Sequence, residues 1–249
     1  MLMKPELKAA VWGALAGAVV SLAMVMGAFG GLPIGATDQR IHDYLATHPQ
    51  ILVELTNKLQ EQDAAKADAT RQAAVRKLGL ARYFNPRVAF VTGPANAKTT
   101  FVEFFDYNCP YCRASLPAVR TFYAGHKNSA RFAFIEFPIK GQESVAAARA
   151  AIAARRQPDK YLAFHFLLMD EKDLVTDDIV FADAAKAGLD VAKLRTDMQD
   201  SAIDIAIAAA HSLAAATSID GTPAFIVNGR IHEGGLDRDI LADLLRKPG

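Results

Sequence analysis

The two cysteines of this chain, Cys109 and Cys112, stand at the junction of an apolar stretch and a helix-like stretch. Residues 100–105 predict a buried strand, and the helical pattern begins at Cys109. A strand that passes directly into a helix at Cys-x-x-Cys places the first sulfur among free backbone N–H groups, at the positive end of the helix dipole. These groups stabilise a thiolate, the form of cysteine that attacks disulfides. Cys112, one turn later, is placed to resolve the mixed disulfide that results.

Two alternative roles for such a cysteine pair are a structural disulfide and part of a metal site. A zinc site normally has four ligands, whereas the six histidines are scattered singly and there is no second cysteine pair. The sequence therefore favours a redox-active disulfide between Cys109 and Cys112, with no metal and no other cofactor. We expect Cys109 to be the nucleophile, with a pKa well below the free-thiol value of about 8.5. We expect Cys112 to be the buried resolving thiol.

A second signal comes late in the chain, where Gly-Thr-Pro-Ala-Phe-Ile-Val-Asn-Gly at residues 221–229 places a proline at the start of a strand. Proline rarely begins a buried strand unless its backbone geometry is special, and a cis bond is one such geometry. Cys-x-x-Cys at a helix start, followed by Thr222-Pro223 before a late strand, resembles the thioredoxin fold. The long helical stretch at residues 142–218 resembles the insertion of the DsbA family of periplasmic thiol-disulfide oxidoreductases.

This resemblance implies an α/β thioredoxin domain over residues 81–249, with a helical insertion at about 141–218. In that family the cis-proline loop lies against the active-site disulfide and pairs with the substrate, which implies substrate binding at Thr222 and Pro223. Glu103 stands in an otherwise apolar strand, where a carboxylate is costly to bury. The family analogy makes it a buried acid that shuttles a proton to and from Cys112. The alternative is a half-exposed strand residue.

Pro110 and Tyr111 are expected to tune the reduction potential of the cysteine pair. In strongly oxidising DsbA enzymes the intervening dipeptide is Pro-His, and the histidine favours the reduced thiolate. Tyrosine in its place implies a less oxidising pair. Because about 30 mV corresponds to ~1.4 kcal/mol for this couple, one substitution can move such an enzyme between oxidase and isomerase behaviour.

The N-terminal segment predicts export. Lys4 and Lys8 precede an uncharged, apolar stretch at residues 9–36. The apolar core of a signal peptide is usually about 7–15 residues, whereas a spanning helix needs about 20, which residues 9–29 supply. We therefore expect an inner-membrane anchor, with a signal peptide cleaved after Ala36 as the alternative. In both cases the positive-inside rule places the rest of the chain in the periplasm.

Residues 37–80 predict a helical segment suited to self-association. Its apolar residues recur at alternating spacings of four and three, as in the seam of an associating helix. Pro49 divides the segment into a short helix at 38–46 and a longer second helix. The segment resembles the N-terminal region of the ScsC branch (suppressor of copper sensitivity, protein C) and predicts a homo-oligomer through residues 38–60. Alternatively, the seam folds back on the catalytic domain. The seam residues are Ile41, Leu45, His48, Leu52, Leu55 and Leu59.

Further strands and helices are expected in the order that a thioredoxin domain requires. Strands are predicted at residues 88–91, 100–105, 131–137, 224–228 and 230–233. Helices are predicted at residues 109–126, 146–154, 161–169, from 176 onward, 201–216 and 236–245.

The functional hypothesis is a periplasmic thiol-disulfide oxidoreductase that acts on exported client proteins and exchanges electrons with a membrane thiol-redox partner. As an oligomer it would be an isomerase or reductase, and the resemblance to ScsC adds a link to copper tolerance. One alternative is a monomeric, membrane-tethered oxidase. Another is a metallochaperone that binds Cu(I) through both thiolates, since soft sulfur ligands suit that ion. With 28 basic and 27 acidic residues, the chain carries no charge excess for nucleic-acid binding.

Overall fold

The computed structural model describes residues 34–246, which fall into two compact units divided between Asp63 and Ala64. Helix α3 (Gln50–Leu78) crosses this division. The sequence placed the boundary after residue 80, but the last turns of α3 belong to the second unit, where Val75 is buried. The predicted membrane anchor at residues 9–29 lies outside the described residues. The alternative, a signal peptide cleaved after Ala36, stays a prediction. Among residues 34–246, no helix combines the length and the apolar character needed to cross a membrane.

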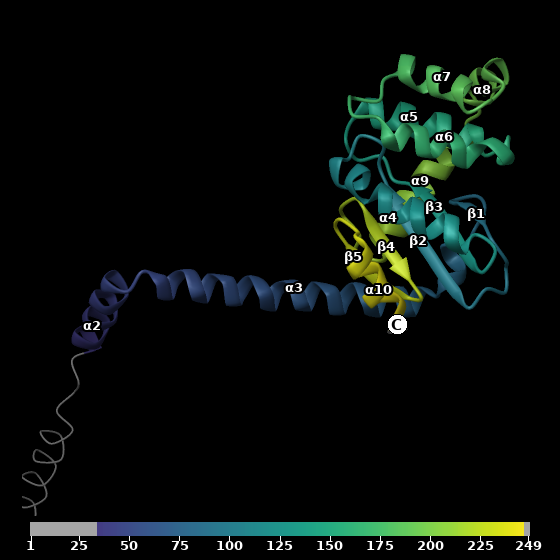
Figure 1. The fold of residues 1–249 in the computed structure, drawn as a ribbon. Helices are drawn as coiled ribbons and strands as arrows, with labels where there is room; N and C mark the ends of the chain where they lie inside the picture. The colour runs from purple at the N-terminus through teal and green to yellow at the C-terminus, as the bar shows by residue number, and fades with distance from the viewer. Residues whose placement is uncertain (1–33, 247–249) are drawn as a thin grey trace, which may run out of the picture. The chain divides into compact units, whose positions relative to one another are not determined.

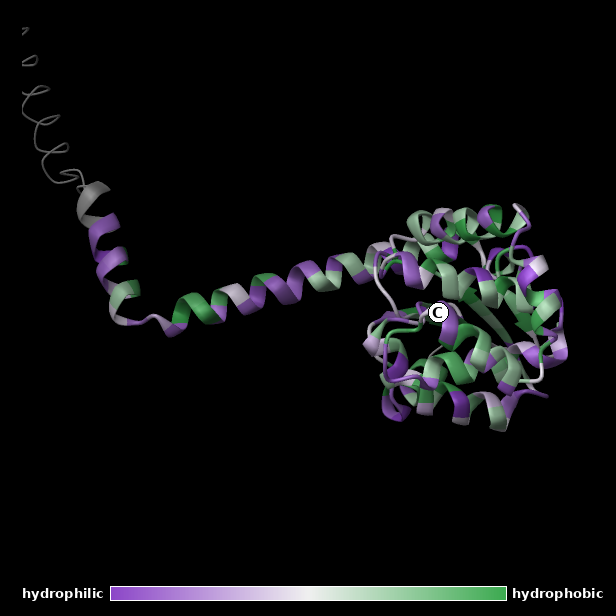
Figure 2. Cartoon of the chain, turned by 90° about the horizontal axis from the view of Figure 1, so that it is seen from above, coloured by the Kyte–Doolittle hydropathy of each residue, from purple (hydrophilic) through white to green (hydrophobic). Residues whose placement is uncertain are grey.

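The first unit contains α2 (Ile34–Thr47) and the start of α3. The predicted division at Pro49 is present, but Pro49 lies directly before α3 rather than in its first turn, and α2 begins four residues before the predicted start at 38. Five large apolar side chains of this unit, and one tyrosine, have half or more of their area exposed, and the start of α3 is hydrophobic in Figure 2. They are Ile41, Tyr44, Leu52, Val53, Leu55 and Leu59.

The second unit is built on a five-stranded mixed sheet (Figure 1). The strand order is β1-β3-β2-β4-β5, with β2 and β3 parallel and every other pair antiparallel. The strands are β1 (Phe90–Thr92), β2 (Thr99–Phe105), β3 (Ala130–Glu136), β4 (Ala224–Val227) and β5 (Arg230–Glu233).

The central strands are hydrophobic on both faces because helices cover both (Figure 2). Alternate residues of β2 face opposite sides. Phe101 and Phe105 pack with residues of α4 (Pro110–His126) and α6 (Pro158–Asp170). Val102 and Phe104 pack with residues of α9 (Ala202–Ala216) and with Val75 at the end of α3. The cysteine pair therefore stands at the head of a helix that is packed firmly on the sheet.

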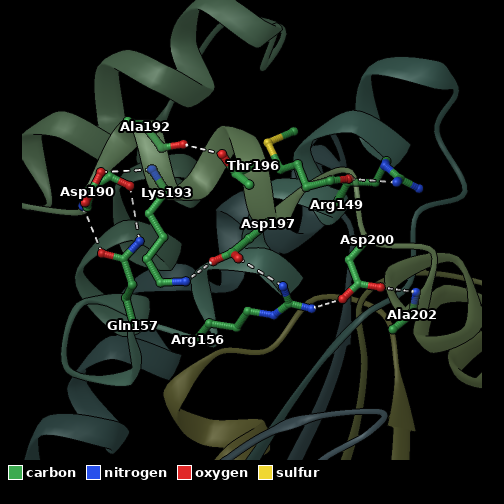
Figure 3. A network of polar contacts seen from close by, with 11 residues as sticks. Arg149, Arg156, Gln157, Asp190, Ala192, Lys193, Thr196, Asp197, Asp200 and Ala202 are labelled. Atoms are coloured by element: carbon green, nitrogen blue, oxygen red, sulfur yellow. Dashed lines mark hydrogen bonds and ion pairs between the residues drawn. The ribbon is translucent and has the colours of Figure 1, made fainter.

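The predicted helical insertion is confirmed and consists of α5 (Gln142–Ala154), α6, α7 (Asp177–Lys186), α8 (Val191–Asp197) and α9. Polar contacts join the end of α5 to α8 and to the start of α9 (Figure 3). Arg156 bonds both Asp197 and Asp200, and Lys193 also bonds Asp197. The sequence did not predict α8, a helix of only seven residues that begins where Asp190 accepts a hydrogen bond from Lys193 N.

Several predicted boundaries differ from the structure. The first strand is at 90–92, because Val88 belongs to a turn in which its N–H donates to Asn85 O at 2.9 Å. Helix α5 begins four residues before the predicted start, directly after Gly141, whose φ of 108° suits glycine. Helix α6 begins with Pro158 in its first turn rather than at residue 161. The last helix, α10 (Arg238–Arg246), starts two residues after the predicted 236.

Candidate active site

The cysteine pair lies at the N-terminus of α4. Cys109 is the N-cap residue, Pro110 follows in the first turn, and Cys112 is one turn into the helix. The Cys109 N–H donates to Asp106 O at 3.1 Å, which holds the turn between β2 and α4. Both cysteines are free thiols and both are 1% exposed, whereas Tyr111 between them is 66% exposed. The first sulfur therefore lies at the end of the helix where backbone N–H groups are unpaired.

The surroundings of the two sulfurs drive their pKa values apart. The pKa of Cys109 is lowered to about 5, chiefly by a hydrogen bond from the Cys112 thiol, against an opposing effect of burial. The Thr222 side chain and the backbone N–H groups of Cys112 and Tyr111 lower it further. Burial, with a smaller effect of Cys109, raises the pKa of Cys112 above that of an ordinary thiol. At neutral pH, Cys109 is therefore a thiolate while Cys112 keeps its proton.

The loop before β4 lies against the first cysteine. Cys109 Sγ is 3.1 Å from Thr222 O, to which the thiol form donates. The Thr222–Pro223 peptide bond is cis, the geometry that the resemblance implied for this position. Pro223 O accepts a hydrogen bond from Gly234 N at 2.9 Å, which ties this loop to the segment after β5. Thr222 and Pro223, distant in sequence from the cysteines, thus form one wall of the site.

Glu103 is buried on the face of β2 that α4 covers. It is 2% exposed and lies in register between Phe134 of β3 and Phe225 of β4. It is therefore not a half-exposed strand residue. Burial raises its pKa to about 8, and its Oε2 atom has no hydrogen-bond partner among residues 34–246. Such a carboxyl group can take up or release a proton near neutral pH.

Asp106 fixes the turn that carries Cys109, and the sequence analysis did not identify it. Its buried carboxylate accepts four hydrogen bonds of 2.7–2.9 Å. One donor, Asn108 N, lies in the active-site turn, and the other three lie between β3 and the first turns of α5. An aspartate directly after a strand is a turn signal, so the local part of this role was visible in the sequence. The donors are Asn108 N, Ile139 N, Lys140 N and Ser144 Oγ.

Arg113 joins the same turn to the loop after α6. Its guanidinium donates to Tyr107 O at 3.0 Å and to Asn108 Oδ1 at 3.1 Å. It also donates to Lys172 O and Asp173 O, at 3.1 and 2.8 Å. The partners in the insertion are far away in sequence, so no local pattern could have predicted this role.

A buried group of polar side chains lies beneath the active-site turn. Tyr107 Oη is 3.1 Å from His165 Nδ1, and burial lowers the pKa of His165 to about 3, so its ring is neutral at pH 7. Tyr161 Oη donates to Glu136 Oε1 at 2.7 Å, and Arg155 pairs with the other oxygen of Glu136. His165 is thus a buried residue of α6 that packs beneath the active-site turn. In residues 34–246, no group of three or more His, Cys, Asp or Glu side chains is arranged to hold a metal ion.

Comparisons with known proteins agree with this geometry. A family model described as thioredoxin matches residues 87–247, more than half of the chain. A thioredoxin-like oxidoreductase from Silicibacter pomeroyi DSS-3 is 36% identical, with a TM-score of 0.61 over 66% of this chain and 93% of that one. A periplasmic thioredoxin-like protein from Salmonella enterica serovar Typhimurium is 30% identical, with a TM-score of 0.60 over 67% and 92%. A linker-deletion mutant of Proteus mirabilis ScsC shares the fold at 22% identity, with a TM-score of 0.63 over 85% and 92%.

The curated proteins with similar sequences are named as Na(+)/H(+) antiporters. The Na(+)/H(+) antiporter NhaA 3 of Salinispora tropica is 32% identical over 181 residues, which make up 72% of this chain and 28% of the antiporter. This chain thus spans little more than a quarter of the length of that relative. The match to the family model and the high coverage of the oxidoreductase structures agree with the cysteine pair, the cis-proline loop and the inserted helices. The chain belongs to the thioredoxin family and has the DsbA-like form of its fold.

Proposed function

We propose that this protein exchanges disulfides with exported proteins through Cys109. The observation that carries the proposal is the opposite shift of the two thiol pKa values, with Cys109 at about 5 and Cys112 raised. A nucleophilic thiolate next to a protonated resolving thiol is the arrangement that disulfide exchange requires.

In the reducing direction, the Cys109 thiolate attacks one sulfur of a client disulfide. A Cys109–client disulfide forms, and the other client sulfur leaves as a thiolate. Cys112 then gives its proton to the Glu103 carboxylate and attacks Cys109 Sγ. The second client sulfur leaves as a thiolate, which takes up the proton from Glu103, and the Cys109–Cys112 disulfide forms. Two electrons pass from the cysteine pair to the client, and the same steps in reverse oxidise a client dithiol.

The residues around Cys109 would bind the client chain. Thr222 and Pro223 would present backbone atoms beside Cys109, and the exposed Tyr111 would contact the client's side chains. Pro110 and Tyr111 would set how strongly the thiolate is favoured. In the absence of the histidine found in strongly oxidising DsbA enzymes, we assign the pair isomerase or reductase activity, with disulfide donation as the alternative.

The setting that we propose is the periplasm, with self-association through residues 38–60. The lysines before the apolar N-terminal stretch and the likeness to a periplasmic thioredoxin-like protein support the location. The exposed apolar side chains of α2 and α3 support the association. A membrane thiol-redox partner would restore the working redox state.

The test is the reduction potential of the Cys109–Cys112 pair against glutathione buffers, together with refolding of a scrambled client. A potential near the ~−180 mV of protein disulfide isomerase, or lower, with recovery of the client would support the proposal. A potential near the ~−120 mV of DsbA without reshuffling would favour the oxidase. Failure of the disulfide to form under mild oxidants, together with tight Cu(I) binding, would favour the metallochaperone.

A further inference from the structure

A groove of about 610 Å³ lies in the second unit, between the turn at residues 85–88, the end of α5 and the first turns of α9. Sites for small molecules commonly have volumes of roughly 300–1,000 Å³. No residue of the candidate active site described above lines the groove, apart from Arg155 of the buried polar group. Its wall along α9 includes Ile205, a large apolar residue that is 70% exposed. The other apolar residues of the lining include Val88, Ile152, Ile203, Ala206 and Ala209.

The groove also has three arginines in its lining, and their charges are not equally compensated. Arg156 pairs with Asp197 and Asp200 (Figure 3), and Arg155 pairs with the buried Glu136. The side chain of Arg87 is exposed and has no hydrogen bond or ion pair within residues 34–246. One cation at the groove is therefore available to an anion.

A second observation is an unpaired donor in the same lining. The guanidinium of Arg155 donates to Glu136 and, at 3.0 Å, to Val88 O. Its Nε atom is buried and has no hydrogen-bond partner in the described part of the chain. Buried N–H groups are nearly always paired, and one that is not carries an uncompensated cost of desolvation. Because this atom is closed off from solvent, the cation that a ligand in the groove can reach is Arg87.

We propose that this groove binds a small amphipathic monocarboxylate. Its carboxylate pairs with Arg87, and its apolar body lies along Ile203, Ile205 and Ala206. Charge-assisted hydrogen bonds to a guanidinium favour a carboxylate over a neutral head group. The lining is a turn and two helices, with no strand edge to pair with a peptide backbone. The groove therefore suits a compact small molecule better than an extended chain.

The test is a titration of the full-length protein, labelled at isoleucine δ1-methyl groups, with decanoate and separately with decan-1-ol. Chemical shifts of Ile152, Ile203 and Ile205 report on the groove, and Ile135 in the sheet is the internal control. We expect saturable shifts of the three groove methyl groups with decanoate. Decan-1-ol should bind at least about tenfold more weakly, because it lacks the charge.

Two variants make the test specific. Arg87→Gln should reduce the affinity for decanoate to that for decan-1-ol, whereas Arg82→Gln, an exposed arginine outside the groove lining, should leave it unchanged. Ile205→Glu, at an exposed position that tolerates substitution, should abolish binding of decanoate. Equal affinity for the two ligands, no effect of Arg87→Gln, or no saturable shift at the three isoleucines would overturn the proposal.

Discussion

At the scale of single residues, Cys109 and Cys112 share one helical turn and nevertheless differ in charge at neutral pH. The hydrogen bond from the Cys112 thiol is the main cause of the lowered pKa of Cys109, and it adds to burial, the main cause of the raised pKa of Cys112. The reactivity of Cys109 therefore depends on a donor at residue 112 as well as on the start of the helix.

Removal of that donor should raise the pKa of Cys109. We expect Cys112→Ala to show a thiolate titration, followed by absorbance at 240 nm, with a midpoint clearly above 5. Cys112→Ser keeps a hydroxyl donor and should show a smaller increase. Equal midpoints for the two variants would mean that the helix terminus alone sets the pKa.

Glu103 should make the stability of the protein depend on pH. Its pKa is raised from 4.5 to about 8 in the folded protein, so the unfolded chain releases this proton first as the pH rises. Stability is then complete below pH 4.5, falls by about 1.4 kcal/mol per pH unit between the two values, and is level above pH 8. Urea unfolding of the oxidised protein, in which no thiol titrates, should show this fall. Glu103→Gln should lack it, and an unchanged pH profile in that variant would contradict the assignment.

Site residues that belong to sequence motifs were predicted. Site residues whose role depends on tertiary contacts were missed. Cys109, Cys112 and Thr222 were identifiable, since each stands at a helix start or a strand start with a chemical signature. Arg113 was not, because its partners after α6 become neighbours only in the folded chain.

At the scale of secondary-structure elements, Asp106 joins β2, the active-site turn and α5. Asp106→Ala leaves four donors without their acceptor, and we expect it to lower the free energy of unfolding by about 3 kcal/mol or more. Ser144→Ala removes one of the four bonds and should cost about 1 kcal/mol. Urea unfolding at pH 7 measures both, and Asp170→Ala, at an exposed side chain, is the control. A loss below 1 kcal/mol for Asp106→Ala would contradict this role.

The elements themselves were predicted where an apolar pattern was long. Strands β2 and β3 and helices α4 and α9 follow from periodicity. Helix α8 was missed because its seven residues span only two turns. The strand predicted at 88–91 lies two residues later. Val88 is buried in the core on the α9 side of the sheet, but it belongs to a turn and not to the strand.

The end of α3 is bonded to the edge strand β5. Gln72 Nε2 donates to Gly229 O at 2.5 Å, and Gln72 Oε1 accepts from Ile231 N at 3.1 Å. We expect Gln72→Ala to speed hydrogen exchange of the Ile231 amide about fivefold, as the loss of one hydrogen bond implies. Gln60→Ala, in the first unit, should leave that amide unchanged. NMR exchange rates measure both, and equal rates in the two variants would contradict the role of Gln72.

At the scale of the whole molecule, the apolar side chains of α2 and α3 should associate. We expect the chain from residue 34 onward to have the light-scattering mass of two or more copies. Leu52→Glu combined with Leu55→Glu should reduce the mass to that of one copy. These leucines are exposed in the single chain, and association would bury the two carboxylates that replace them, which is costly. Gln60→Glu on the same helix is the control. A single-copy mass for the unsubstituted chain would favour the monomeric oxidase.

The two bonds of Gln72 have a consequence for solubility. Its side-chain amide offers β5 one donor and one acceptor, as the peptide group of a neighbouring strand would. An open edge strand invites other chains to add to a sheet, which is a route to aggregation. The exported clients that we propose for this protein would bring such a risk to its sheet edge. Gln72 occupies two backbone groups at this edge, Gly229 O and Ile231 N, so a strand added there could not pair with either of them.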